Sequence, residues 1–105
     1  QPELLSRILQ CVQDHFCEHD FNVSRAADLL GLSVAYLSKY FKRQTGVNLL
    51  NYLNSLRIDY AKKLMDEEQI TVAEVADRAG YENANTFIRL FKKYAGDTPG
   101  NYNKL

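Results

Sequence analysis

The sequence contains few of the residues that interrupt helices. Of its 105 residues only two are Pro and five are Gly, and no run of β-branched residues occurs. Because Pro and Gly are the least favourable residues in a helix interior, their scarcity leaves room for long helices, and the missing β-branched runs argue against strands. The hydrophobic share of 46% is ordinary for a folded chain, and the length suits one small domain, or two very small ones that share a helix.

Other absences restrict the class of function. No apolar run is long enough to cross a membrane and no signal peptide is present, since the first ten residues are amphipathic. The only cysteines, Cys11 and Cys17, fall on different faces of one predicted helix, so we expect no disulfide and a reducing, cytoplasmic setting. No nucleophile–base pair, phosphate-binding loop or pair of carboxylates occurs, so we expect neither an enzyme nor a cofactor. The start without Met indicates a fragment of a longer protein.

A metal site is a weak alternative. Cys11, His15 and His19 recur every fourth residue of the first predicted helix, and three such ligands on one stripe are compatible with a metal-responsive sensor. No fourth ligand is evident, and such stripes are more often incidental. We therefore predict no metal.

The net charge is zero, which at first argues against a nucleic-acid partner, but the charges are segregated along the chain. The net charge is −3 in residues 1–30, +5 in 31–65, −5 in 66–82 and +3 in 83–105. Such asymmetry can build a basic face on a neutral protein. Evenly solvated helix faces remain the alternative.

Hydrophobic periodicity and capping residues predict an all-α fold of seven helices and no strand. The expected helices cover residues 3–19, 23–30, 33–45, 49–67, 71–79, 83–95 and 99–102. The predicted capping residues are Asn22, Ser33, Asn48, Thr71, Asn83 and Thr98. The third helix should bury a stripe made of Val34, Leu37, Tyr40 and Phe41. We divide the chain into a first subdomain (1–48), a linking helix (49–67) and a second subdomain (68–105).

An internal repeat relates the two subdomains. ADLLGLSVAYLSKYFKRQTG in the first returns as ADRAGYENANTFIRLFKKYAG in the second, at an offset of 49 residues up to Gly31 and Gly80 and of 50 residues thereafter. In each copy a small residue four positions before the glycine lets two helices approach closely, and Leu37 or Phe87 fixes the second helix on the first. This pattern predicts two helix-turn-helix units, whose second helices (33–45 and 83–95) enter the DNA major groove.

These segments resemble the AraC/XylS family of bacterial transcription regulators over essentially the whole chain. The resemblance is carried by LGLSVAYLSKYFKRQTG, by RIDYAKKLM and by VAEVADRAGYENANTFIRLFKKYAGDTPGNY. It implies two helix-turn-helix subdomains joined by a long helix, with their recognition helices in successive major grooves of double-stranded promoter or operator DNA. It also implies an activator or repressor with a separate sensor or receiver domain elsewhere in the full-length chain.

One departure from the family pattern concerns the C-terminal end. The family usually ends in G-x-x-P-x-x-Y-R, whereas Tyr102 is followed here by Asn103, so Lys104 would have to replace the arginine. The resemblance also singles out Arg57 in the linking helix. We assign it a structural ion pair with Asp28, Asp59 or an acid of the second subdomain.

Base edges are read by exposed positions near the start of a recognition helix. Lys39 and Arg89 occupy matching positions and suit guanine, Asn85 suits adenine, and the alanines and isoleucine suit thymine methyls. The predicted base contacts are Ala35, Ser38, Lys39, Ala84, Asn85, Ile88 and Arg89. For the two alanines, plain helix-forming residues are an equal alternative.

Phosphate contacts need donors at helix starts and flanks. The predicted set is Ser33, Tyr36, Arg43, Asn48, Asn83, Thr86, Lys93 and Thr98. For Lys42 and Lys92, a phosphate contact and a position with the side chain lying over the apolar core are equal alternatives. Tyr52 and Tyr102 are predicted to belong to the core. A second class of function remains open: the same frame docking on RNA polymerase or a receiver domain, with DNA contact secondary.

Overall fold

The structure is a computed structural model that describes residues 2–103, and within that range it contains seven α-helices and no strand. The helices are α1 (Pro2–His15), α2 (Val23–Leu30), α3 (Val34–Thr45), α4 (Leu49–Glu67), α5 (Val72–Arg78), α6 (Ala84–Ala95) and α7 (Pro99–Asn103). The predicted all-α fold is confirmed.

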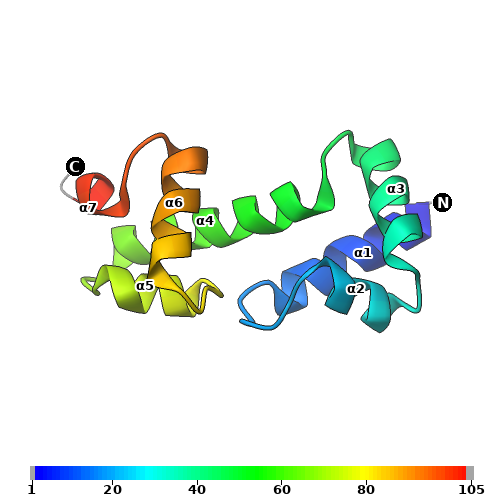
Figure 1. The fold of residues 1–105 in the computed structure, drawn as a ribbon, viewed down its shortest axis with the longest axis horizontal. Coiled ribbons are helices and arrows are strands. Elements are labelled where there is room, and N and C mark those ends of the chain that lie inside the picture. Colours follow the sequence, from blue (N-terminus) through cyan, green and yellow to red (C-terminus); the bar gives the residue numbers. More distant parts are fainter. Residues whose placement is uncertain (1, 104–105) are drawn as a thin grey trace.

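The molecule is elongated, with two lobes at opposite ends of α4 (Figure 1). The first lobe contains α1, α2 and α3, and the second contains α5, α6 and α7. The principal dimensions are 44 × 23 × 22 Å. At 1.5 Å per residue the 19 residues of α4 span about 28 Å, so this helix covers most of the distance between the lobes.

Each lobe has its own hydrophobic core, and α4 contributes to both. Leu49 and Leu53 enter the first core, whereas Ile58, Ala61 and Met65 enter the second. The rest of the first core is Leu4, Ile8, Val12, Phe21, Ala26, Ala27, Leu37, Tyr40 and Phe41. The rest of the second is Val75, Ala76, Ala79, Tyr81, Phe87 and Phe91. Burial of these apolar side chains stabilises each lobe.

Side-chain caps begin the helices where the sequence predicts them. Asn22 accepts a hydrogen bond from the N–H of Arg25 at 2.8 Å, and Ser33 accepts one from the N–H of Tyr36 at 3.1 Å. The same function is served by Asn48, Thr71, Asn83 and Thr98. Each cap satisfies an N–H group that the first turn of a helix leaves without a partner.

Two expectations about local structure are wrong. The first helix ends at His15 rather than at residue 19, because the chain must turn there to carry Phe21 into the first core, where it is 2% exposed. Val34 is 44% exposed rather than part of the buried stripe of α3. It is the first residue of that helix, and the face that meets the core begins one turn later, at Leu37.

The acidic end of α4 is held by a contact that the sequence did not predict. The guanidinium of Arg78 donates two hydrogen bonds to the carboxylate of Glu68, at 2.9 and 3.1 Å. These bonds hold the pKa of the Glu68 carboxyl below its usual range. Within the described part of the chain no helix is long and apolar enough to cross a membrane.

Candidate nucleic-acid interface

The pairs α2–α3 and α5–α6 have the same turn geometry, which extends the sequence repeat to the backbone. Gly31 and Gly80 both adopt positive φ, 69° and 104°. In each turn the N–H of the next residue donates to a carbonyl five residues earlier, Leu32 to Ala27 and Tyr81 to Ala76, both at 2.9 Å. Both units are therefore helix-turn-helix motifs, in which α3 and α6 are the second helices.

On α3, core packing determines which face is free. Leu37, Tyr40 and Phe41 are buried in the first core. The predicted base contacts of this helix line one surface hollow on the opposite face. The lining residues are Val23, Ala35, Ser38, Lys39, Lys42, Asn48, Leu49 and Leu50. The structure thus brings the three predicted base contacts of α3 together and adds Lys42 beside them.

On α6, Phe87 and Phe91 are fully buried, and Asn85 and Arg89 are exposed one turn apart on the outer face. Residues four apart share a helix face, so these two side chains can reach adjacent base pairs. Ala84 and Ile88 are half-buried and pack against the second core, and Thr86 is also half-buried. Their predicted contacts with DNA are limited to the part of each side chain that remains exposed.

The recognition helices carry cations that form no close ion pair with the described acids. Lys39, Lys42 and Arg43 on α3 and Arg89, Lys92 and Lys93 on α6 form no ion pair within 4.0 Å among residues 2–103. Lys93 instead lies over the ring of Tyr94, with its ammonium 5.5 Å from the ring centroid. Cations that form no ion pair are available to phosphate oxygens and base acceptors.

Both recognition helices stand across the long axis of the molecule and on the same side of it, α3 in the first lobe and α6 in the second, with α7 farther out than α6 (Figure 1). The major-groove segments on one face of a duplex recur after about one helical turn, ~34 Å. The longest dimension of the whole molecule, 44 Å, exceeds that spacing. Binding of both helices to one face of a duplex remains a prediction.

Four predicted phosphate contacts already serve as helix caps. The side-chain oxygens of Ser33, Asn48, Asn83 and Thr98 accept main-chain N–H groups, so the hydroxyl hydrogen or amide NH₂ of each remains to donate. The others are placed differently: Tyr36 is 52% exposed, Arg43 is exposed, and both lie on α3. The contacts with DNA remain predictions for all of these residues.

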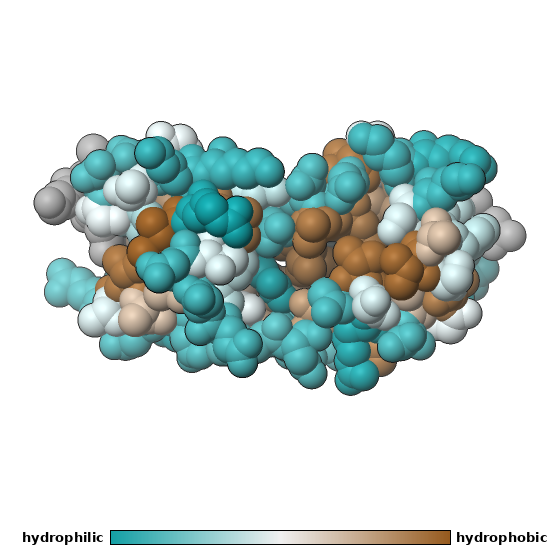
Figure 2. All heavy atoms as spheres, in the orientation of Figure 1, coloured by the Kyte–Doolittle hydropathy of each residue, from teal (hydrophilic) through white to brown (hydrophobic). Residues whose placement is uncertain are grey.

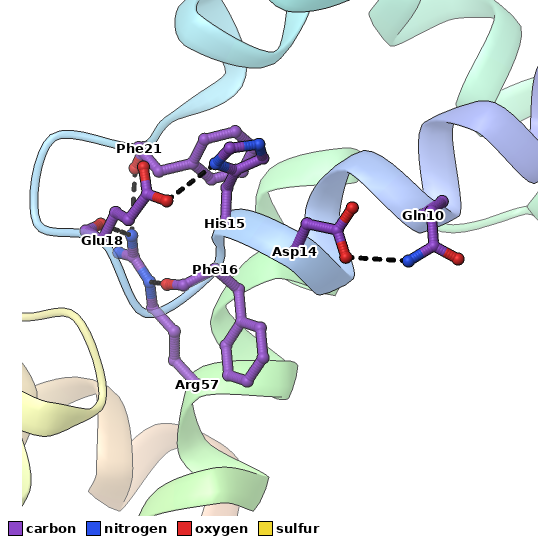
Figure 3. A network of polar contacts seen from close by, with 7 residues as sticks. All are labelled: Gln10, Asp14, His15, Phe16, Glu18, Phe21 and Arg57. Carbon is purple, nitrogen blue, oxygen red and sulfur yellow. Dashed lines mark hydrogen bonds and ion pairs between the residues drawn. The ribbon is translucent and has the colours of Figure 1, made fainter.

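Among residues 2–103 Arg57 forms no ion pair, contrary to the prediction. It is 7% exposed and donates to three main-chain carbonyls of the segment that follows α1 (Figure 3). The bonds run from Nε to Phe16 at 2.6 Å and from Nη2 to Glu18 and Phe21 at 3.0 Å each. Carbonyl oxygens exposed by the end of α1 thus replace the expected carboxylate. Burial lowers the pKa of Arg57 from its usual value, but a guanidinium stays charged in proteins.

The sequence interpretation overlooked a second buried polar residue, Asn54, one turn before Arg57 on α4. The hydroxyl of Tyr81 donates to Asn54 Oδ1 at 2.9 Å. Burial raises the pKa of Tyr81 to about 12, so the hydroxyl keeps the proton that it donates. The sequence could have indicated this contact only by the polar residue Asn54 beside the apolar Leu53. Its partner, Tyr81, belongs to the second lobe, 27 residues further along the chain, so no local pattern connects the two.

The three residues considered as a possible metal stripe, Cys11, His15 and His19, do not share a helix face, because His19 lies beyond the end of α1. His15 Nδ1 is 2.7 Å from the Glu18 carboxylate, and His19 Nε2 is 3.1 Å from that of Asp77. Burial and then the nearby acids raise the pKa of Cys11, which disfavours the thiolate that a metal would need. In residues 2–103 no three His, Cys, Asp or Glu side chains are grouped for a metal ion.

The aromatic residues predicted for the core pack at its edges. The ring of Tyr52 lies 5.4 Å from that of Phe41, and the ring of Tyr102 lies 5.5 Å from that of Phe91. The hydroxyl of Tyr102 also donates to Asp66 at 3.3 Å and so attaches α7 to α4. Lys104, the expected substitute for the family arginine, lies outside the described residues.

Comparison with known proteins gives concordant matches. A family model described as a helix-turn-helix domain matches residues 26–105. The arabinose operon regulatory protein of Escherichia coli (strain K12) is 30% identical over 93 residues, which are 89% of this chain and 32% of that protein. The chain spans between 11% and 37% of the length of the curated relatives that it matches.

Solved structures agree with this fold. The C-terminal domain of the two-component response regulator yesN from Fusobacterium nucleatum has a TM-score of 0.90 and 33% identity, over 93% of this chain and 95% of that one. The DNA-binding domain of AdpA, a global transcriptional factor solved in complex with a target DNA, has a TM-score of 0.86 and 25% identity, over 95% of this chain and 89% of that one.

Proposed function

Because this chain belongs to the AraC-type helix-turn-helix family of transcription regulators, we propose that it binds one face of duplex DNA with α3 and α6 in successive major grooves. One observation supports the two-groove arrangement: the same turn geometry occurs twice, and in both copies the second helix carries cations that form no ion pair among the described residues. Salt should weaken this binding steeply, since each phosphate contact releases counterions.

Base readout is concentrated in α6. Arg89 binds guanine and Asn85 binds adenine, because these side chains match the edges of those bases with two hydrogen bonds. On α3 only Lys39 offers a comparable donor, and Ala35 and Ser38 add small contacts. We therefore expect stronger base preferences in the half of the operator that α6 binds than in the half that α3 binds.

The domain works as part of a longer regulator in this proposal. Its curated relatives extend well beyond the matched region, and a close structural neighbour is the C-terminal domain of a two-component response regulator. A receiver or other sensor domain in the full-length chain would then control when the domain engages its promoter.

A protein-docking function is the second candidate, and one observation favours it. In the part of the chain whose burial the structure describes, the exposed large hydrophobic residues all belong to residues 29–50: Leu29, Val34, Tyr36, Val47 and Leu50. On the face drawn in Figure 2, hydrophobic surface is likewise more extensive on the lobe that contains α3. Such a surface suits RNA polymerase or a receiver domain as partner.

The decisive experiment is selection of binders from random duplexes at low salt, followed by footprinting. Two protected blocks on one face would support two-groove binding and reveal the operator. A single block would mean that only one unit reads bases. Absence of enrichment at any salt concentration would contradict DNA binding by this domain and favour the docking function.

Replacing Arg89 by Ala should weaken binding to the selected operator by about 1–3 kcal/mol and relax selection at one base pair. Quantitative competition between operator variants measures both effects. Lys93→Ala is the matched control on the same helix; it should weaken all sequences alike and lower the salt dependence by about one phosphate contact. Uniform weakening by Arg89→Ala would instead make Arg89 a phosphate contact. Polymerase binding that survives Arg89→Ala with Lys39→Ala would support the docking function.

A further inference from the structure

We propose that Arg57 is a positioning residue for DNA binding: it locks the two lobes in one relative orientation, so that α3 and α6 meet their grooves together. The locking contacts form a junction, defined here as Arg57 and Asn54 of α4, residues 16–21 of the first lobe and residues 77–81 of the second. This inference rests on the proposed two-groove binding.

The first lobe is attached to the junction by its main chain. The guanidinium of Arg57 holds the carbonyls of Phe16, Glu18 and Phe21 at 2.6–3.0 Å (Figure 3). These carbonyls belong to the turn between α1 and α2, so Arg57 fixes the segment that leads into the first helix-turn-helix unit. A planar fork of donors suits this arrangement, and the ammonium of a lysine does not reproduce its geometry.

The second lobe contacts the same guanidinium from the other side. The Arg57 guanidinium carbon lies 5.2 Å from the centroid of the Tyr81 ring, whose hydroxyl donates to Asn54. Gly80 packs so closely that a Cβ atom there would lie 2.8 Å from the Phe16 oxygen and 2.9 Å from Arg57 Nε. Gly80 and Tyr81 belong to the turn of the second helix-turn-helix unit, immediately before α6.

A direct contact between the lobes completes the junction. His19 Nε2 lies 2.9 Å from the main-chain oxygen of Asp77 and 3.1 Å from its carboxylate. His19 follows α1, and Asp77 is in the last turn of α5. This contact is partly exposed, so we expect it to contribute less than the buried Arg57.

The orientation of the lobes depends on this junction because their cores are separate. Each core would survive a small rotation of its lobe on α4, since the apolar contacts within the lobe would move with it. The hydrogen bonds of Arg57 to the first lobe are directional, and the same guanidinium lies against the Tyr81 ring of the second lobe, so a rotation of one lobe disturbs these contacts. If the lobes could rotate relative to each other, α3 and α6 would no longer face successive major grooves at the same time.

The first test needs no DNA. Residual dipolar couplings of backbone amides should fit one alignment tensor for both lobes in the wild-type chain, and two different tensors in Arg57→Gln. Lys63→Gln removes the same charge from an exposed position of α4 and should leave one tensor. Native amide shifts within each lobe would confirm that Arg57→Gln is folded. A single tensor in folded Arg57→Gln would overturn the proposal.

If Arg57→Gln does not fold, Arg57→Lys is measured in the same way, since it keeps the charge but loses the fork. The expected result is again two tensors, and a single tensor in folded Arg57→Lys would overturn the proposal.

The second test varies the spacing between the two operator blocks obtained by selection. Wild type should lose about tenfold or more in affinity when one base pair is inserted or removed, because the second helix no longer faces its groove. Folded Arg57→Gln should bind the original spacing about tenfold more weakly and bind isolated blocks as wild type does, which partial unfolding would not produce. If folded Arg57→Gln kept the steep dependence of affinity on spacing that wild type shows, the positioning role of Arg57 would be contradicted, but two-groove binding would not. A flat profile for wild type would instead contradict two-groove binding itself.

Discussion

Phe87→Ala is expected to unfold the second lobe while the first lobe stays folded. Phe87 is 0% exposed, and its ring lies 5.7 Å from that of Tyr81 and 5.6 Å from that of Phe91. Truncating a buried Phe to Ala costs about 3–5 kcal/mol, from lost burial and from the cavity that remains. That cost is a large fraction of the total stability of a small domain, about 5–15 kcal/mol.

The loss should stay within one lobe because the cores are separate. No residue is shared between the two cores, and α4 supplies different side chains to each. The matched substitution is Leu37→Ala, at the equivalent position of the first unit and also 0% exposed, which should cost about 2–5 kcal/mol and unfold the first lobe instead.

Amide exchange and two-dimensional NMR spectra of the two variants would measure this effect. Phe87→Ala should remove protection from α5, α6 and the second half of α4, and Leu37→Ala from α1 to α3. A variant that lost protection evenly over the whole chain would contradict independent cores. DNA binding by Phe87→Ala should fall to what the α3 unit provides alone.

The repeat explains why so much of the fold could be predicted. Helix starts follow from local chemistry, and capping residues such as Ser33 and Asn83 make the hydrogen bonds that their positions predict. The burial of Leu37 and Phe87 follows from helical periodicity within each unit. Each of these features depends on residues a few positions apart, and the second copy supports the interpretation of the first.

The failures concern contacts between residues far apart in sequence. Arg57 was singled out by the family resemblance and was expected to form a structural ion pair with an acid. Its real partners are carbonyls of Phe16, Glu18 and Phe21, which became available only because α1 ends early. Every residue has a carbonyl, so no side-chain pattern could identify these three.

The candidate site was predictable to a different degree on each helix. On α6, the spacing of Asn85 and Arg89 determines that both face outward, as the structure has them. On α3, the sequence did not predict that the adjoining face is closed by Leu49 and Leu50 of α4, which line the same hollow as Lys39. The surface offered by α3 is therefore more apolar than its own residues indicate.

Gly80→Ala should destabilise the chain far more than Gly31→Ala, although the two glycines are equivalent in the repeat. Both adopt positive φ, which costs a residue with a Cβ atom about 1–2 kcal/mol. At Gly31 nothing lies within 4 Å of the added Cβ atom, so this cost should be the whole effect. At Gly80 the Cβ atom would lie 2.8 Å from the main-chain oxygen of Phe16, which cannot move without disturbing its bond to Arg57.

We therefore expect a loss of about 1–2 kcal/mol for Gly31→Ala and of about 3 kcal/mol or more for Gly80→Ala, which combines backbone strain with loss of a buried, charged hydrogen bond. Urea unfolding followed by circular dichroism would measure the difference. Equal losses of unfolding free energy in the two variants would mean that the junction can rearrange without loss of stability, and hence that Arg57 does not hold the lobes together. The double variant tests where the extra cost arises. If Gly80→Ala lowers the free energy of unfolding much less in Arg57→Gln than in wild type, the extra cost comes from the contact between the lobes, because the effects of interacting positions are not additive.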